Sequence, residues 1–173
     1  MDNEKTKELS NQNGMLYQGK VTVSFLDNGR LIAANSCCNS GSKKLFNFFS
    51  SCLQGNWASA KNERPNKIVL FRDDTDNFYN YPASSAIIYD SAPTVEVKDK
   101  ETSVTFHFRI PFLYMKQGAT IKKLCLYPPM ISSLQNDLLA YVSLTESEQF
   151  TIPESGGNMT TIVDWKMTVE NVD

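Results

Sequence analysis

Regular alternation of apolar and polar residues near the end of the chain restricts the fold more than any other feature of the sequence. From Val163 to Val169 every second residue is apolar. Because successive side chains of a β-strand point to opposite faces of the sheet, this pattern predicts a strand with one buried face. The residues expected to face the core are Val163, Trp165, Met167 and Val169, and those expected to face outward are Asp164, Lys166 and Thr168.

Shorter strand-like segments recur through the chain. Residues 20–26 and 30–34 flank Asp27-Asn28-Gly29, whose tolerance of positive φ predicts a tight hairpin turn. The other predicted strands are residues 67–72, 86–89, 94–98, 102–110, 120–127, 138–145 and 149–152. About nine or ten short strands at this spacing predict a mainly β protein, an antiparallel β-sandwich. The sequence shows no strand–helix–strand unit, so a doubly wound fold is not expected.

One segment follows a helical period instead. Leu45, Phe48, Phe49, Cys52 and Leu53 are spaced so that they share one face of a helix. We predict one short α-helix here that packs on the sandwich, and the alternative is a ligand groove lined by this apolar face. Gly55 can end the helix, and residues 56–65 are predicted to form a loop.

The length and charge of the chain indicate one domain of ordinary composition. It has 173 residues and a formal net charge of -2, which does not favour binding to nucleic acid or to an anionic membrane. No apolar run approaches the ~20 residues of a transmembrane helix. Residues 1–14 are polar and lack the apolar core of a signal peptide. We therefore expect a flexible N-terminal arm over residues 1–14 and a single domain over residues 15–173.

The four cysteines are expected to be free thiols. Without a secretory signal the chain would be made in a reducing cytosol, where disulfides are rare. Cys37 and Cys38 are adjacent, and the sequence has no Cys-x-x-Cys pair that would indicate a zinc or redox site. Cys52 and Cys125 lie in apolar segments, where cysteine behaves as a small hydrophobic residue.

Residue types that usually carry catalysis are scarce. His107 is the only histidine, and no nucleophile motif accompanies it. We interpret His107 as a surface or interface residue; a catalytic base and a pH-sensitive contact are the alternatives. Asp73, Asp74 and Asp76 suit a solvated loop or a weak cation site. The sequence predicts no catalytic residues, no metal site and no cofactor, and so no enzymatic activity.

Two long loops carry apolar side chains that could contact a partner. The first loop contains Phe78, Tyr79 and Tyr81, and the second contains Met130, Ile131 and Leu134. Long loops are usually functional or disordered, and soluble monomers seldom expose a large apolar patch. We therefore predict that these six side chains contact partner subunits. For the aromatic loop, packing on its own domain is the alternative.

Two blocks of sequence resemble a known class of proteins. The first runs from Gly19 to Asn35, contains Lys-Val-Thr-Val-Ser-Phe-Leu, and leads into the predicted helix. The second combines residues 121–127 (Ile-Lys-Lys-Leu-Cys-Leu-Tyr), 138–144 (Leu-Leu-Ala-Tyr-Val-Ser-Leu), 150–158 and 161–171, which end in Trp-Lys-Met-Thr-Val-Glu-Asn. Their order resembles small β-rich virion structural proteins of tailed bacteriophages, of the tail-collar, ring or auxiliary capsid type, including those of crAss-like phages.

This resemblance implies a non-enzymatic structural component of a bacteriophage virion. Such a component is a tail or collar ring protein or an auxiliary, decorating capsid protein. Its implied partners are copies of itself and other virion proteins in a symmetric assembly, without nucleic acid or membrane. It would be synthesised in the host bacterial cytoplasm and reside in the virion. The alternative function is a carbohydrate- or receptor-binding β-sandwich module, which the aromatic loop and Trp57 favour.

Overall fold

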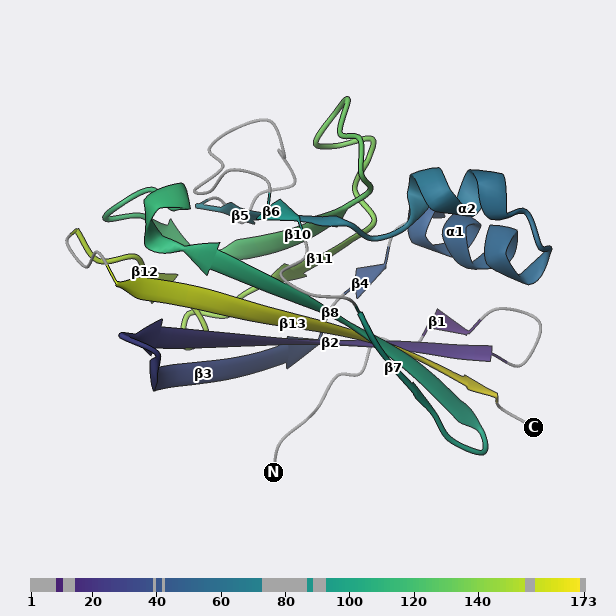
Figure 1. Cartoon of the computed structure of the whole chain (residues 1–173), viewed down its shortest axis with the longest axis horizontal. Helices are drawn as coiled ribbons and strands as arrows, with labels where there is room; N and C mark the ends of the chain where they lie inside the picture. The colour runs from purple at the N-terminus through teal and green to yellow at the C-terminus, as the bar shows by residue number, and fades with distance from the viewer. Residues whose placement is uncertain are drawn as a thin grey trace.

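Antiparallel strands make up most of the structure. It is a computed structural model, and it describes residues 9–10, 15–38, 40–41, 43–72, 87–88, 93–154 and 158–171. The described strands form a six-stranded, a five-stranded and a two-stranded sheet (Figure 1). The prediction of a mainly β protein is thus confirmed. A sandwich of nine or ten strands is not confirmed, because several of the thirteen strand segments described have only two residues.

The six-stranded sheet is arranged around the last strand of the chain. Its order is β1 (Leu9–Ser10), β2 (Met15–Asp27), β13 (Met159–Asn171), β8 (Glu101–Pro111) and β7 (Thr94–Val97), and β3 (Arg30–Cys38) also pairs with β2. Of the predicted inward residues, Val163, Trp165 and Met167 are buried, and Val169 is half-buried. Thr168 was predicted to face solvent, but it is only 9% exposed, and Ser103, opposite it on β8, is buried as well. The alternation is therefore correct for this strand, although its outer face is covered at one end.

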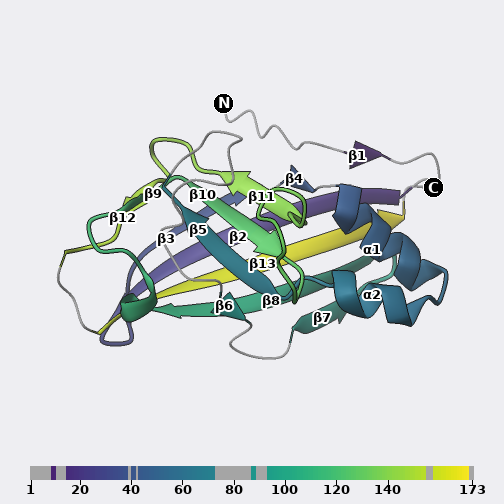
Figure 2. The same ribbon diagram turned by 90° about the horizontal axis from the view of Figure 1, so that it is seen from above.

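The five-stranded sheet lies over one face of the six-stranded sheet. Its order is β4 (Ser40–Gly41), β11 (Ala140–Ser143), β10 (Lys123–Tyr127), β5 (Lys67–Phe71) and β6 (Ile87–Ile88). The view from above shows its strands crossing those of the larger sheet at an angle (Figure 2). The facing sides share one hydrophobic core, which includes Val21, Val23, Phe106, Phe108, Val163 and Trp165 from the larger sheet and Ile68, Leu70, Leu124, Leu126, Ala140 and Val142 from the smaller sheet.

The predicted strand over residues 120–127 is divided between two sheets. β9 (Thr120–Ile121) pairs with β12 (Phe150–Thr151), whereas β10 belongs to the five-stranded sheet. The change occurs at Lys122, whose N–H donates to the Phe71 carbonyl and whose carbonyl accepts from the Leu144 N–H. A short 3-10 helix, η1 (Phe112–Tyr114), follows β8.

The predicted hairpin after β2 is confirmed. Asn28 and Gly29 have φ values of 48° and 78°, as a two-residue turn that matches the twist of its strands requires. The paired strands are longer than predicted, and their register shifts between Phe25 and Leu26. Leu9 and Ser10, which belong to the expected flexible arm, form β1 and pair with β2. The other residues of 1–14 lie outside the described residues.

The predicted helix is confirmed as α1 (Lys43–Leu53), and its apolar face belongs to the core. Leu45 is fully buried, and Phe48 and Phe49 pack against the same core from the edge. The alternative of a ligand groove on this face is therefore not what the structure shows. Gly55, with φ 71°, ends the helix.

A second helix, α2 (Trp57–Glu63), occupies the segment that we predicted to be a loop. The Asn56 N–H donates to the Ser51 carbonyl and the Gly55 N–H to the Cys52 carbonyl, which closes α1 in a Schellman motif. The Asn56 carbonyl then accepts from the Ala60 N–H and begins α2, as suits asparagine at a helix start. The loop prediction was wrong. The sequence of α2 shows no apolar stripe that would mark a helix, since its tryptophan, Trp57, is exposed and the small Ala60 is buried.

Replacement of Trp165 by alanine tests the assignment of the core. Trp165 is fully buried between the two sheets, so we expect the free energy of unfolding to fall by ~3–5 kcal/mol. Trp57→Ala is the matched control, since 68% of that residue is exposed, and it should change stability by less than ~0.5 kcal/mol. Urea denaturation measures both. Equal losses in the two variants would contradict this core assignment.

Candidate functional site

Edge strand β7 is exposed along its whole length. All four of its residues are exposed, including Val95 at 59% and Val97 at 74%. Within the described part of the chain, β7 pairs only with β8 and ends the six-stranded sheet. Figure 1 shows β7 and the turn to β8 at the margin of the molecule. An open edge of this kind offers backbone hydrogen-bonding groups to another chain.

The hydrogen bonding of the β7–β8 hairpin determines which backbone groups face the open edge. The Lys98 N–H donates to the Glu101 carbonyl at 2.7 Å, so these two residues form a hydrogen-bonded pair. Such pairs alternate along an antiparallel ladder, and the register places Glu96 opposite Ser103 in the next one. The N–H and C=O groups of Val95 and Val97 therefore point away from β8, toward the open edge.

Two cross-strand links hold the other side of β7 in place. Thr94 Oγ1 lies 2.9 Å from His107 Nε2, and His107 Nδ1 lies 2.8 Å from Asp164 Oδ1. Lys166 Nζ lies 3.4 Å from Glu96 Oε2. The first link joins β7, β8 and β13, and the second joins β7 to β13. Because both side chains of this face of β7 are linked, the edge strand is held to the sheet by side-chain contacts as well as by its pairing with β8.

The row Thr94–His107–Asp164 places a hydroxyl, an imidazole and a carboxylate in the order that covalent hydrolases use. Acyl transfer also requires a substrate cavity and donors for an oxyanion. Asp164 is 41% exposed in its side chain, and none of the three residues lines the cavity near Phe25. We therefore interpret the row as a cross-strand link, in keeping with the prediction of a surface or interface role for His107.

An apolar cavity lies at the end of β8 away from the β7 hairpin. It measures about 220 Å³, and its lining includes Phe25, Phe112, Phe150, Met115 and Met159. The rings of Phe25 and Phe150 are 4.2 Å apart between centroids. Among the described residues no charged side chain lines this cavity, and its polar side chains are Thr151 and Thr161, so it offers space for an apolar group without a charge to orient it.

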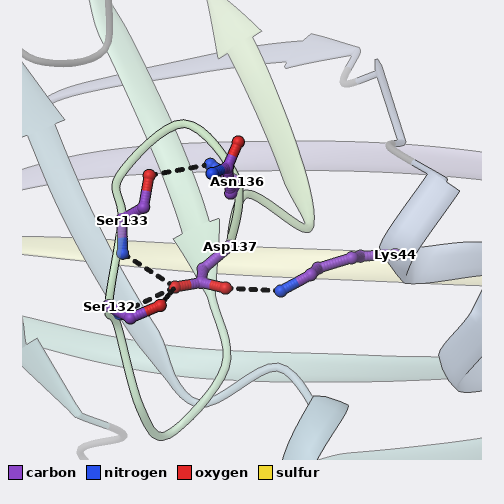
Figure 3. A network of polar contacts seen from close by, with 5 residues as sticks. All are labelled: Lys44, Ser132, Ser133, Asn136 and Asp137. Carbon is purple, nitrogen blue, oxygen red and sulfur yellow. Dashed lines mark hydrogen bonds and ion pairs between the residues drawn. The ribbon is translucent and has the colours of Figure 1, made fainter.

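The loop between β10 and β11 is anchored by Asp137 (Figure 3). Asp137 Oδ2 accepts hydrogen bonds from the Ser132 N–H and hydroxyl, both at 2.7 Å, and from the Ser133 N–H at 2.9 Å. Its Oδ1 forms an ion pair with Lys44 of α1. Burial acts to raise the pKa of Asp137, but Lys44 and the serine donors outweigh it and hold the pKa well below its ordinary value.

This anchored loop contains three of the predicted contact residues. Ile131 and Leu134 pack against a second core cluster on the outer face of the smaller sheet, formed by Val69, Phe71, Cys125, Tyr127 and Leu138. Met130 is 83% exposed. Of these three side chains, Met130 is thus the one most open to a partner. The other predicted contacts, Phe78, Tyr79 and Tyr81, lie outside the described residues, as do Asp73, Asp74 and Asp76.

Sequence reasoning predicted the strand at β7 but not its role as an exposed edge. Two signals were present, namely Pro93 before the strand and the charged turn Asp99-Lys100-Glu101 after it. Proline is confined to the edges and starts of sheet strands because it lacks an N–H. The link from His107 had no signal, because its partners are 13 and 57 residues away in the sequence.

The thiols differ in environment, and the four are free as predicted. Burial, with Glu148 and Cys38 nearby, raises the pKa of Cys37 to about 12, and burial raises the pKa of Cys125 and of Cys52. A raised pKa leaves the thiol protonated and unreactive near neutral pH.

We therefore expect a thiol reagent at pH 8 to modify exposed Cys38 first, and all four thiols after denaturation. Rapid modification of Cys125 in the native protein would contradict the structure.

Replacement of Asp137 by asparagine should destabilise the protein in a pH-dependent way. At pH 7 we expect a loss of about 1–3 kcal/mol, because the donors around this carboxylate lose a charged acceptor. The pKa is depressed in the folded state, so the stabilisation is present above the unfolded pKa of about 3.9 and is lost as the pH falls below it. Denaturation at pH 7 and pH 3 should show that the difference in unfolding free energy between the variant and the unmodified protein is smaller at pH 3. Asp99→Asn, in an exposed turn, is the control, and an equal pH dependence there would contradict the assignment.

In the part of the chain that the structure describes, no three His, Cys, Asp or Glu side chains lie close enough to hold a metal ion. The helices described there are too short or too polar to cross a membrane. Comparison with family models, curated proteins and solved structures finds no match to this chain.

Proposed function

We propose that this protein is a non-enzymatic structural subunit that binds copies of itself and other proteins in a symmetric assembly. The observation that carries the proposal is the open edge of β7, with Val95 and Val97 exposed and its other side chains linked to His107 and Lys166. Soluble proteins usually cover or blunt such edges, because they pair readily with another strand. A rigid edge with apolar side chains suits a permanent contact better than a solvated surface.

The assembly proposed is a bacteriophage virion, in which the protein is a tail or collar ring component or an auxiliary capsid protein. The support for this part is the resemblance of the two sequence blocks. These blocks correspond to the β2–β3 hairpin with α1, and to β9–β13. The finer fold proposal, an antiparallel β-sandwich, is supported by the core that the two larger sheets share. The site of action would be the virion, after synthesis in the bacterial cytoplasm.

A carbohydrate- or receptor-binding module is the second candidate. The described residue that favours it is Trp57, whose side chain is exposed on α2. An exposed aromatic ring can stack on an apolar face of a ligand. The two candidates differ in self-association, since a binding module has no need of copies of itself.

Light scattering coupled to gel filtration tests the structural proposal. We expect masses above the monomer value of 19.5 kDa that rise with protein concentration. Val97→Lys places a charge at the open edge and should weaken self-association by about tenfold or more, equivalent to ~1.4 kcal/mol. Circular dichroism should show an unchanged fold, because Val97 is exposed.

Leu31→Lys is the matched control, since Leu31 is 59% exposed on β3 at the other side of the larger sheet. This variant should associate as the unmodified protein does. A monomeric mass at every concentration would overturn the structural proposal and favour the binding module. Equal weakening by both lysines would show that β7 is not the contact.

A further inference from the structure

We infer that a second copy of this chain pairs with β7 in antiparallel orientation across a two-fold axis, with Val95 opposite Val95 of the partner subunit. The inference rests on the proposed function, because it names the occupant of the open edge and its register. Two larger sheets would then continue into one another through their β7 strands. A two-fold contact uses the same surface on both subunits, so the sequence of β7 must be complementary to itself.

The backbone of β7 meets this requirement. The N–H and C=O groups of Val95 face the open edge, because Lys98 and Glu101 form a hydrogen-bonded pair and such pairs alternate along the ladder. A two-fold axis at Val95 makes the two Val95 residues a hydrogen-bonded pair, in which each N–H donates to the other carbonyl. The Val97 N–H then reaches the carbonyl of the partner subunit's Pro93. Pro93 has no N–H to donate, so the pairing ends there.

The side chains select this register over its neighbours. With the axis at Val95, Thr94 lies opposite Glu96 of the partner subunit, so the two Glu96 carboxylates do not directly oppose each other. With the axis at Glu96, two carboxylates would be directly opposite each other, which destabilises a strand pair. With the axis at Val97, pairing would extend to Asp99 of the partner subunit, which lies in the bend at residues 99–100.

The other long edge of the larger sheet is less suited to such a contact. β3 carries an irregularity where its register with β2 shifts, and bulges of this kind blunt an edge against pairing. Asn35 of β3 also donates its side-chain N–H to the Glu148 carbonyl. For β7 the described residues show no register shift. Its four residues form a small contact, which is weak alone and gains strength when many subunits are held together.

Disulfide trapping tests the register directly. In a Cys38→Ser background, which removes the exposed thiol, Val95→Cys should form a covalent dimer on mild oxidation. Hydrogen-bonded antiparallel pairs have Cα atoms ~5.5 Å apart, within the ~4.4–6.8 Å that a disulfide spans. Thr94→Cys and Glu96→Cys should each cross-link about tenfold more slowly alone, yet form a dimer with each other when mixed.

The outcomes separate this inference from the proposed function. Cross-linking of Glu96→Cys alone, without Val95→Cys, would establish another register and overturn the inference while self-association stands. A protein that associates in light scattering but is trapped by none of these cysteines would show that β7 does not bind a second copy. A monomer at every concentration, with no trapping, would overturn both. Circular dichroism on each variant confirms that the cysteine has not unfolded the edge.

Discussion

Strand β13 is the element on which the rest of the structure depends, because it is hydrogen-bonded along both edges and supplies the centre of the core. β2 pairs with its whole length and β8 with most of it, while Trp165 fills the space between the two main sheets. Its two neighbours come from the beginning and the middle of the chain. The larger sheet can therefore close only after β13 has been synthesised, and contacts so distant in sequence are expected to make folding slow.

Strands β5 and β10 of the smaller sheet are covered on both faces by other parts of the subunit. One face of β5 and β10 belongs to the main core and the other to the cluster of Val69, Cys125 and Tyr127. The loop anchored by Asp137 and Lys44 lies against that second cluster and is fixed to α1. Apolar residues that look available in the sequence are thus used inside the subunit. The edge of the larger sheet at β7 stays exposed, and so do polar side chains of its outer face such as Asp164 and Glu96.

Polar residues on the outer face of the larger sheet hold the edge strand β7 in position. His107 and Asp164 lie on adjacent strands, and Thr94 extends their row onto β7. Lys166 and Glu96 repeat the arrangement one step along the sheet. Each exposed pair contributes little stability by itself, but together they restrict the position of a short strand that has one neighbour. An edge that is ordered in advance loses less entropy when another strand is added, which is why the row and the proposed contact belong together.

The sequence by itself determined the local elements whose residues carry their own signal. Alternation predicted β13 with its faces, Asn28 and Gly29 predicted the hairpin, and the apolar stripe predicted α1. Tertiary structure decided which strands become neighbours, because a period of two identifies a face of a strand but not the strand beside it. For the same reason it alone decided the split at Lys122, the row through His107, the packing of Ile131 and Leu134 on the second cluster, and the open edge at β7. Helix α2 was not predicted because Ala60, which is buried, has no buried apolar neighbours at helical spacing.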